Sequence, residues 1–307
     1  MKFYSANEIA KIWGVSGQFV RRYCKEGKIP EAVFENGTWL IPEGTNKPGS
    51  PIITRAVEMS PLLKKVLYQQ ERNNHFGIYE YIQLNTAYSS NRMASNRLKR
   101  QQVETIYRTS RIDPGFEPVK IDDILEIINH IAAMDFIIRS ALDPLTSDYV
   151  KKLHYLLTYG TFADRRQYLG SGTFRTKPPR LYRETAAAPN EIVRKLNQLV
   201  MTYEKDSTDL HEILAFHAHL EQIRPFTDYN GRVGRLIMMK ECLRYGIDPF
   251  IIDDKHRAAY NRGIAMWDED PSILTGVVIQ AQKRFQNQMD TCRLFEYCRT
   301  KNPRKLL

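Results

Sequence analysis

The stretch IRPFTDYNGRVGRL, residues 223–236, places a proline, an acid and an Asn-Gly-Arg segment close together. Proline and Asn-Gly interrupt regular structure, so we expect a loop here that leads into a helix starting near Gly231. At such a junction the backbone N–H groups and the positive end of the helix favour an anion, above all a phosphate. The sequence therefore predicts a phosphate-binding loop, and this loop begins with a permanent cation, Arg224.

The composition is that of a globular protein with a polyanionic partner. Of the 307 residues, 42% are hydrophobic and 26% are charged, which is enough for a large domain and a small one. The formal net charge of +10 favours a nucleic acid as partner, although a solvated basic surface gives the same balance. There is no apolar run of about 18 residues and no apolar N-terminal segment, so we expect no membrane span and no signal peptide. Four cysteines without CxxC spacing indicate reduced thiols, and we predict a cytoplasmic protein.

The first fifty residues carry the pattern of two short helices and a hairpin. Ser5 and Glu8 have the spacing of a capping box, which predicts the start of a first helix. Ser16 is placed to cap a second helix after a short turn. The Asn36-Gly37 pair between apolar-rich flanks is a strong hairpin signal.

Helix, turn, helix and hairpin in this order resemble the small winged-helix DNA-binding domain of the excisionase and MerR-like group. The resemblance implies that the second helix enters the major groove of duplex DNA while the hairpin lies on the backbone. The alternative is a helical cap whose basic face is only solvated. The residues expected to contact DNA are Gln18, Arg21, Arg22, Lys25 and, in the hairpin, Asn36.

From residue 58 onward the pattern is almost entirely helical, with short interruptions that carry Gly or Pro. The exception is GSGTFRTKPPRLYRE, residues 170–184, which favours a β-hairpin flap. The expected helices cover residues 120–140, 146–159, 189–204, 208–222, 231–245, 256–267 and 271–299. The predicted organisation is a winged helix over 1–46, a linker over 47–57, N-terminal helices over 58–110, a helical core over 111–290 and a basic tail over 291–307.

The opening stretch resembles the signature of the Fic family, HPFx[D/E]GNGRxxR. The segments around it, DLHEILAFHAHLEQI and LIMMKECLRYGIDPFIIDDKHRAAYNRGIAMW, are also similar to the family, and the resemblance covers residues 60–290. It implies a mainly α protein with an all-helical Fic-like core and a small β-hairpin flap. The positions in register with the signature are Pro225, Phe226, Asp228, Asn230, Gly231, Arg232 and Arg235.

Members of this family transfer AMP, or less often another phosphate-containing group, from a nucleotide to a protein hydroxyl. The resemblance therefore implies ATP and Mg²⁺ as cofactors, with Asp228 as the Mg²⁺ ligand. It also implies that Asn230 and Gly231 cradle phosphate, while Arg232 and Arg235 hold the remaining phosphates. For the two arginines, surface salt bridges are the alternative interpretation.

Two positions depart from the signature. Arg224 stands where the catalytic His is expected, and Tyr229 stands where the first Gly of the phosphate nest is expected. Arginine stays protonated and has no acceptor nitrogen, so it cannot remove a proton. Tyr229 adds a Cβ and a ring where the backbone should approach phosphate, and a positive φ there costs about 1 kcal/mol or more. Both changes indicate a loss of AMP transfer.

A third departure lies in YSSNRMASNRL, residues 88–98, which resembles the inhibitory helix of the family, [S/T]xxxE[G/N]. Ser90 fits this pattern, but Ala94 stands at the inhibitory Glu and Ser95 at the following Gly or Asn. The resemblance implies that the missing Glu would pair with Arg235. Its loss together with the base fits a protein that has abandoned catalysis, and it also fits an enzyme with altered chemistry.

The leading hypothesis is a DNA-binding regulator, homodimeric on paired half-sites, whose Fic-like domain is deficient in AMP transfer and binds a nucleotide or a partner protein. One alternative is an active Fic-type transferase with unconventional chemistry. The other is an antitoxin-like protein that binds a protein partner. We interpret His217 and His219, which precede the loop, as structural residues, and no metal-ligand cluster stands out beyond Asp228.

Overall fold

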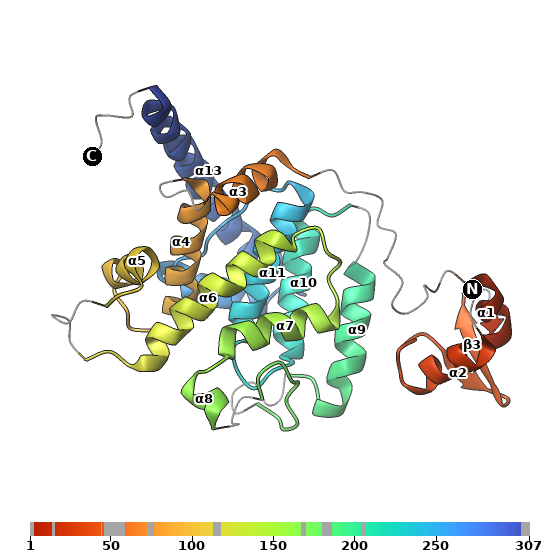
Figure 1. Cartoon of the computed structure of the whole chain (residues 1–307). Helices are drawn as coiled ribbons and strands as arrows, with labels where there is room; N and C mark the ends of the chain where they lie inside the picture. Colours follow the sequence, from red (N-terminus) through yellow and green to blue (C-terminus); the bar gives the residue numbers. More distant parts are fainter. Residues whose placement is uncertain are drawn as a thin grey trace. The chain divides into compact units, whose positions relative to one another are not determined.

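A computed structural model shows a chain of two compact units, Met1–Ala56 and Val57–Leu307 (Figure 1). The structure describes residues 3–13, 16–43, 45, 59–72, 77–112, 118–166, 170–179, 186–203 and 207–301, with side chains up to residue 291. The predicted linker, residues 47–57, lies outside these residues, and the predicted domain limits stay predictions. In the described part, no helix is both long enough and apolar enough to cross a membrane.

The small unit contains the two expected helices and the expected hairpin. Ser16 accepts a hydrogen bond from Phe19 N (3.2 Å) and so begins the second helix. Asn36 and Gly37 both have positive φ, 49° and 77°, as a two-residue hairpin turn requires. An additional strand pairs with the hairpin, in the antiparallel order β1-β3-β2. The elements are β1 (Phe3–Ser5), α1 (Ala6–Trp13), α2 (Gly17–Lys25), β2 (Val33–Glu35) and β3 (Thr38–Pro42).

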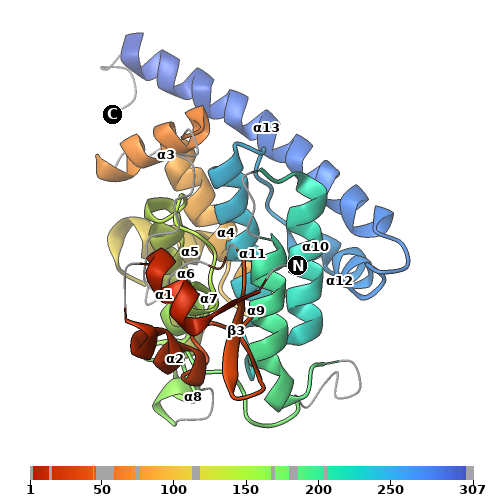
Figure 2. The same cartoon turned by 90° about the vertical axis from the view of Figure 1, so that its right-hand side faces the viewer.

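The large unit is a layered bundle of helices, so the predicted mainly α fold is confirmed. Helix α11 lies at its centre and packs against α3, α4, α6, α7 and α10. Figure 2 shows the long helix α13 along one side of this bundle. The helices are α3 (Pro61–Glu71), α4 (Ile78–Met93), α5 (Arg100–Thr109), α6 (Ile121–Arg139), α7 (Ser147–Thr158), α8 (Phe162–Arg165), η1 (Pro189–Glu191), α9 (Ile192–Tyr203), α10 (Leu210–Ile223), α11 (Asn230–Tyr245), η2 (Asp254–His256), α12 (Arg257–Ala265) and α13 (Ser272–Lys301).

Because α11 is surrounded, its polar side chains need partners inside the bundle. Lys240 Nζ is completely buried and forms an ion pair with Glu241 Oε1 (2.6 Å). The same ammonium donates to Asp143 O (2.7 Å), and Tyr203 OH donates to Glu241 Oε2 (3.1 Å). These contacts fix the rotation of α11 about its axis, and with it the position of the loop that precedes the helix.

One expectation needs correction. Among the described residues 170–179 there is no strand, so this part of the predicted flap is not a hairpin; residues 180–184 lie outside the described residues. The physical reason is that this segment bonds to the loop instead of to a second strand, since Arg175 N donates to Pro225 O (2.9 Å). The helix expected over residues 271–299 is α13, which continues to Lys301 and so includes the first part of the predicted basic tail.

The contact between α12 and α13 predicts a large effect of one methyl group. A Cβ at Gly263 would lie 2.7 Å from both the backbone N and the Cα of Leu274. We therefore expect Gly263→Ala to lower the free energy of unfolding by about 1–3 kcal/mol, as overpacking does. The measurement is urea unfolding of the full chain.

The matched control is Gly276→Ala in α13, where an added Cβ meets no atom within 4 Å. It should leave stability unchanged or raise it by up to about 1 kcal/mol, because Ala has the higher helix propensity. Equal effects of the two substitutions would show that the close contact at Gly263 is not a constraint.

Candidate functional site

The loop between α10 and α11 begins and ends with a residue whose backbone is in the left-handed region. Arg224 has φ 47° and ends α10, with its N–H donating to Leu220 O (3.0 Å). Tyr229 has φ 64° and is the N-cap of α11, without a side-chain cap. Asn230 closes the loop, because its Oδ1 accepts from Phe226 N (3.0 Å) and its Nδ2 donates to Phe226 O (2.9 Å). The Asn side chain thus shapes the loop itself.

Phe226 anchors the loop in the core. Its ring is 1% exposed and stacks on His154, with ring centroids 3.9 Å apart and planes 5° from parallel. His154 Nδ1 accepts a hydrogen bond from Gly172 N (3.0 Å). Burial lowers the pKa of His154 to about 4, so this ring is neutral near pH 7 and packs as an apolar surface.

A buried guanidinium, that of Arg175, fastens the loop from the other side. Its Nε donates to Arg224 O (2.7 Å), its Nη2 to Ala187 O and Ile223 O, and its Nη1 to Lys177 O (3.1 Å). Burial lowers the pKa of Arg175 below its ordinary value. Sequence reasoning missed this residue, because nothing in FRTKPP distinguishes a buried arginine from a solvated one.

Tyr229 is buried against the first motif arginine. The Arg232 guanidinium carbon lies 3.4 Å from the centroid of the Tyr229 ring. Tyr229 OH donates to Glu126 Oε1 (2.9 Å), and Arg232 Nη1 lies 2.8 Å from the same oxygen. Arg232 Nη1 also donates to Asn91 Oδ1 (3.2 Å). Arg232 is therefore engaged by the protein, and Glu126 is a site residue that sequence reasoning missed.

This cluster also sets the ionisation of its members. Burial raises the pKa of the Tyr229 phenol, so the hydroxyl remains a hydrogen-bond donor. Burial would also raise the pKa of Glu126, but the charge and hydrogen bonds of Arg232, together with further hydrogen bonds, outweigh it and lower this pKa. The carboxylate thus stays ionised between the two partners.

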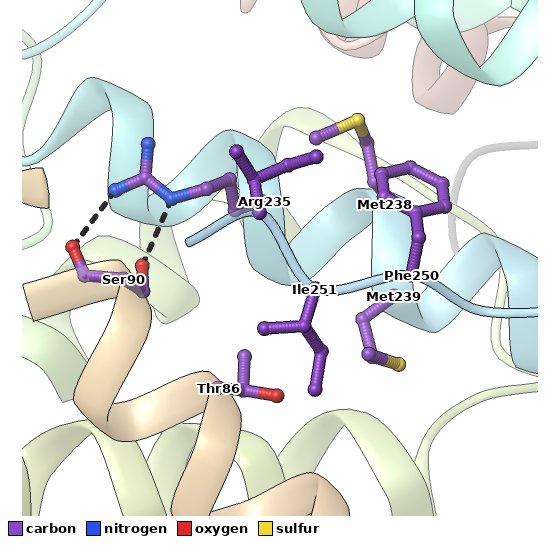
Figure 3. A pocket seen from close by; sticks show the side chains of 8 residues that line it. Thr86, Ser90, Arg235, Met238, Met239, Phe250 and Ile251 are labelled. Atoms are coloured by element: carbon purple, nitrogen blue, oxygen red, sulfur yellow. Dashed lines mark hydrogen bonds between the residues drawn. The ribbon is translucent and has the colours of Figure 1, made fainter. Parts of the chain in front are cut away.

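Arg235, the second motif arginine, is bound by the helix that resembles the inhibitory one (Figure 3). Its Nε donates to Ser90 Oγ (3.0 Å) and its Nη2 to Ser90 O (3.1 Å). Ala94 lines the cavity at the loop, and Ser95 has φ 72° just beyond α4. Beside Arg235 lies a small pocket of about 20 Å³, near Thr86, which has room for roughly one water. Arg235 therefore has its partners on α4.

Glu221 is a third residue that sequence reasoning missed. Its Oε2 lies 3.4 Å from Arg224 Nη2, and its side chain is 7% exposed. Its Oε1 is buried and makes no hydrogen bond within the described residues. Burial raises the pKa of Glu221, while Arg224 and Arg235 act in the opposite direction. A Cβ at Gly231 would lie 3.2 Å from Glu221 Oε1 and 3.0 Å from Arg235 Nη1, so glycine leaves the room these two groups occupy.

The loop, α12 and the end of α4 enclose a cavity of about 440 Å³. The uncapped N-terminus of α11 offers N–H donors to an anion there. Asp228 is exposed, and its Oδ1 accepts a hydrogen bond from Tyr229 N (2.6 Å). A single exposed carboxylate fits a Mg²⁺ ion whose other ligands include phosphate oxygens. The charged residues of the lining are Glu221, Arg224, Asp228, Arg232, Arg235 and Arg257.

None of the histidines in the described part of the chain lines this cavity. His217 is completely buried and its Nε2 bonds Tyr260 OH. His219 lies at the surface, with Nε2 3.1 Å from Asp268 Oδ1. The cavity therefore combines anion-binding groups with two carboxylates and lacks an imidazole base among the described residues.

The comparisons with known proteins agree with this geometry. Residues 144–242 match the model of the Fic/DOC family. Protein adenylyltransferase fic-1 of Caenorhabditis elegans is 27% identical over 179 residues, which are 54% of this chain and 32% of that protein. Protein adenylyltransferase Fic of Nematostella vectensis is 25% identical over 175 residues, 55% of this chain and 40% of that protein. The chain thus spans less than half the length of these curated relatives.

Solved structures give the same fold. A Fic-domain-containing signalling protein from Bacteroides thetaiotaomicron superposes with a TM-score of 0.56 at 19% identity, covering 75% of this chain and 91% of that one. Residues 134–508 of Fic-1 from C. elegans superpose with a TM-score of 0.59 at 22% identity, covering 75% and 72%. The large unit thus has the fold of these Fic proteins. This chain contains a Fic/DOC domain and is related to protein adenylyltransferases, so this part of the resemblance is confirmed.

Buried histidines predict a pH dependence of stability. The pKa is lowered by burial to about 4 for His154 and to about 3 for His130 and His217, from an ordinary value of 6.5. Below pH 6.5 the unfolded chain binds more protons at these histidines than the folded chain does. Their contribution to the free energy of unfolding is therefore complete above pH 6.5 and is lost as the pH falls toward their folded-state pKa values. Each histidine adds a slope of up to about 1.4 kcal/mol per pH unit.

Urea unfolding of the full chain at several pH values between 4 and 7 measures this slope. His154→Asn, which keeps an acceptor for Gly172 N, should show a shallower rise of stability with pH. An unchanged slope in this variant would contradict a neutral, buried His154.

Proposed function

We propose that this protein is a DNA-binding regulator whose Fic/DOC domain no longer transfers AMP and keeps its cavity for an anionic ligand. The observation that carries the proposal is the guanidinium of Arg224 at the position of the motif base, beside buried Glu221. A general base is worth about 10²–10⁴ in rate, and arginine cannot supply one. The described residues around the cavity include no histidine that could take over.

The phosphate-binding part of the loop supports the same conclusion. Arg232 is paired with Glu126 and covered by the Tyr229 ring, so it is not free to hold a phosphate without losing these contacts. The N-terminus of α11, Arg257 and Arg235, whose partner Ser90 is neutral, still line the cavity, with Arg224 beside Glu221. Mg²⁺ bound at Asp228 would supply further positive charge to a phosphate held there. The cavity is therefore suited to binding a phosphate-bearing ligand rather than to reacting with it.

The small unit supports the DNA-binding part of the proposal through the surface of α2. Gln18 and Lys25 are exposed and have no partner among the described residues. Arg22 lies over the stacked rings of Phe19 and Tyr23, 5.6 Å from each centroid, and stays exposed. Such a helix presents cations to phosphates or to base edges.

A second candidate function keeps AMP transfer, and Glu221 is the observation in its favour. This buried carboxylate lines the cavity, and its pKa is raised by burial, as that of a general base often is. In this alternative, Glu221 Oε1 takes the proton that the motif His takes in the family. Activity of the unmodified protein that disappears in Glu221→Gln would favour it over the first proposal.

The first test is transfer of label from α-³²P-ATP with Mg²⁺ to protein. We expect no transfer by the natural sequence, and self-labelling by the double variant Arg224→His, Tyr229→Gly. The His supplies a base near neutral pH, and the Gly removes the ring from the loop. Arg224→His alone should give less, because Tyr229 still covers Arg232.

The matched control is Arg224→Gln, Tyr229→Gly, which opens the loop equally and provides no base. Labelling by this control as strong as by the His variant would exclude the base argument. Strong labelling by the natural sequence would overturn the proposed loss of activity. Calorimetry with ATP and Mg²⁺ separates a site that binds without reacting from one that has lost binding.

The second test concerns DNA. Replacing both Arg21 and Arg22 by Ala should weaken binding to duplex DNA about tenfold or more and reduce the salt dependence by roughly two phosphate contacts. Gel shifts with the DNA upstream of the protein's own coding region, over a series of salt concentrations, measure both. The control replaces Arg194 and Lys195, two neighbouring cations of α9 that pair with Glu191, by Ala. Equal affinities of the two double variants would contradict a role of α2 in DNA binding.

A further inference from the structure

A second cavity, of about 600 Å³, lies between α4, α5 and α6. Figure 1 shows these three helices as neighbours on one side of the large unit. The cavity shares no lining residue with the cavity at the loop. Its volume falls within the range of about 300–1,000 Å³ that small-molecule sites have. The proposed function makes no use of it.

One wall of this cavity is apolar and comes mainly from one face of α6, whereas Arg108, Ser110 and Arg111 line the cavity elsewhere. Ile124, Ile128 and Ile131 follow each other at the spacing of a helical stripe. Ile106 and Tyr107 of α5 complete the wall. Ile128 is 46% exposed although it is a large apolar side chain, so the cavity leaves apolar surface uncovered. Such a wall offers a ligand the gain of burying apolar surface.

A fixed carboxylate ends the apolar stripe. Asp135 lies one helical turn beyond Ile131 on α6 and also lines the cavity. Its Oδ1 accepts three hydrogen bonds, from Tyr79 OH (2.6 Å), Gln70 Nε2 (2.9 Å) and Gln83 Nε2 (2.5 Å). Within the described residues no group donates to its Oδ2. Asp135 is therefore held in one orientation by one oxygen, and its other oxygen is left for a further donor.

The surrounding charges favour a cation at this oxygen. The Tyr79 phenol stays protonated and donating, because burial raises its pKa to about 12. Arg108, which also lines the cavity, has its own anion in Glu80 (2.8 Å). Arg111 is exposed at the rim, where solvent screens its charge. Asp135 is thus the carboxylate in the cavity lining, and no cation of the described residues forms an ion pair with it.

We propose that this cavity binds an apolar amine, whose hydrocarbon body covers the isoleucine wall and whose ammonium group donates to Asp135 Oδ2. A charge-assisted hydrogen bond of this kind is stronger than one from a neutral donor, so the carboxylate selects amines over alcohols of the same shape. A carboxylic acid of the same shape is excluded by repulsion from Asp135. For a regulator, this would be a site for an effector that is separate from the anion cavity at the loop.

The test uses 2-phenylethylamine as probe and the full chain labelled with ¹³C at the isoleucine δ1 methyls. Saturable shifts are expected for the methyls of Ile124, Ile128 and Ile131, and none for Ile121, which is on the same helix but does not line the cavity. With 2-phenylethanol the affinity should be roughly tenfold lower, as the loss of a bond between charged groups predicts. With 3-phenylpropanoate no binding is expected.

Two variants complete the test. Ile128→Arg puts a cation into the cavity and should abolish the shifts, whereas Ile121→Arg, the same change at a residue that is 67% exposed, should not. Asp135→Asn should lower the affinity for the amine about tenfold, to that of the alcohol. If this variant does not fold, the relative affinities of the natural sequence for the amine, the alcohol and the carboxylate still test the proposal. Equal affinity for amine and alcohol, or non-saturable shifts at all isoleucines alike, would overturn the proposal.

Discussion

The buried charge of Arg232 is the interaction on which the functional loop depends. Its side chain is 5% exposed, and it is satisfied by Glu126 from α6, Asn91 from α4 and the ring of Tyr229. Breaking a buried ion pair costs about 3–5 kcal/mol, so these partners must stay together. The start of α11, two neighbouring helices and the end of the loop are thereby held in one arrangement. Because this pairing fixes the start of α11, the backbone N–H groups at the N-terminus of the helix face the anion cavity.

The same pairing explains how a tyrosine is tolerated where the family signature has glycine. Holding a non-glycine residue at φ 64° costs about 1–3 kcal/mol. The buried cation–π contact with Arg232 contributes about 2 kcal/mol. The hydrogen bond to the charged Glu126 contributes roughly 1.5–3 kcal/mol more. These gains exceed the strain, so Tyr229, Arg232 and Glu126 act as one unit, and a glycine would leave the two charged residues less well covered.

Much of the fold could be predicted from the sequence because it rests on local patterns. Periodic apolar residues locate the helices expected from residue 120 onward to within three residues, and Asn36-Gly37 locates the hairpin turn. For the site, the sequence predicted only residues that belong to the recognised motifs. Glu126, Arg175 and Glu221 come from segments whose local pattern is that of an ordinary helix or loop, and only the tertiary fold brings them to the loop. The missing hairpin over residues 170–179 has the same cause, since Arg175 bonds to loop carbonyls that no local pattern reveals.

Helix α4 contributes residues to both the anion cavity and the amine cavity. Near its first turn, Tyr79 donates to Asp135 in the amine cavity, and near its last turn, Ser90 holds Arg235 beside the anion cavity. The two residues are about 16 Å apart along the helix, at 1.5 Å per residue. A ligand in one cavity can change the affinity of the other only if it binds two states of the protein with different strength. A shift of α4 along its axis moves both Tyr79 and Ser90. The two states that a ligand would have to distinguish would therefore differ in the contacts of Tyr79 with Asp135 and of Ser90 with Arg235.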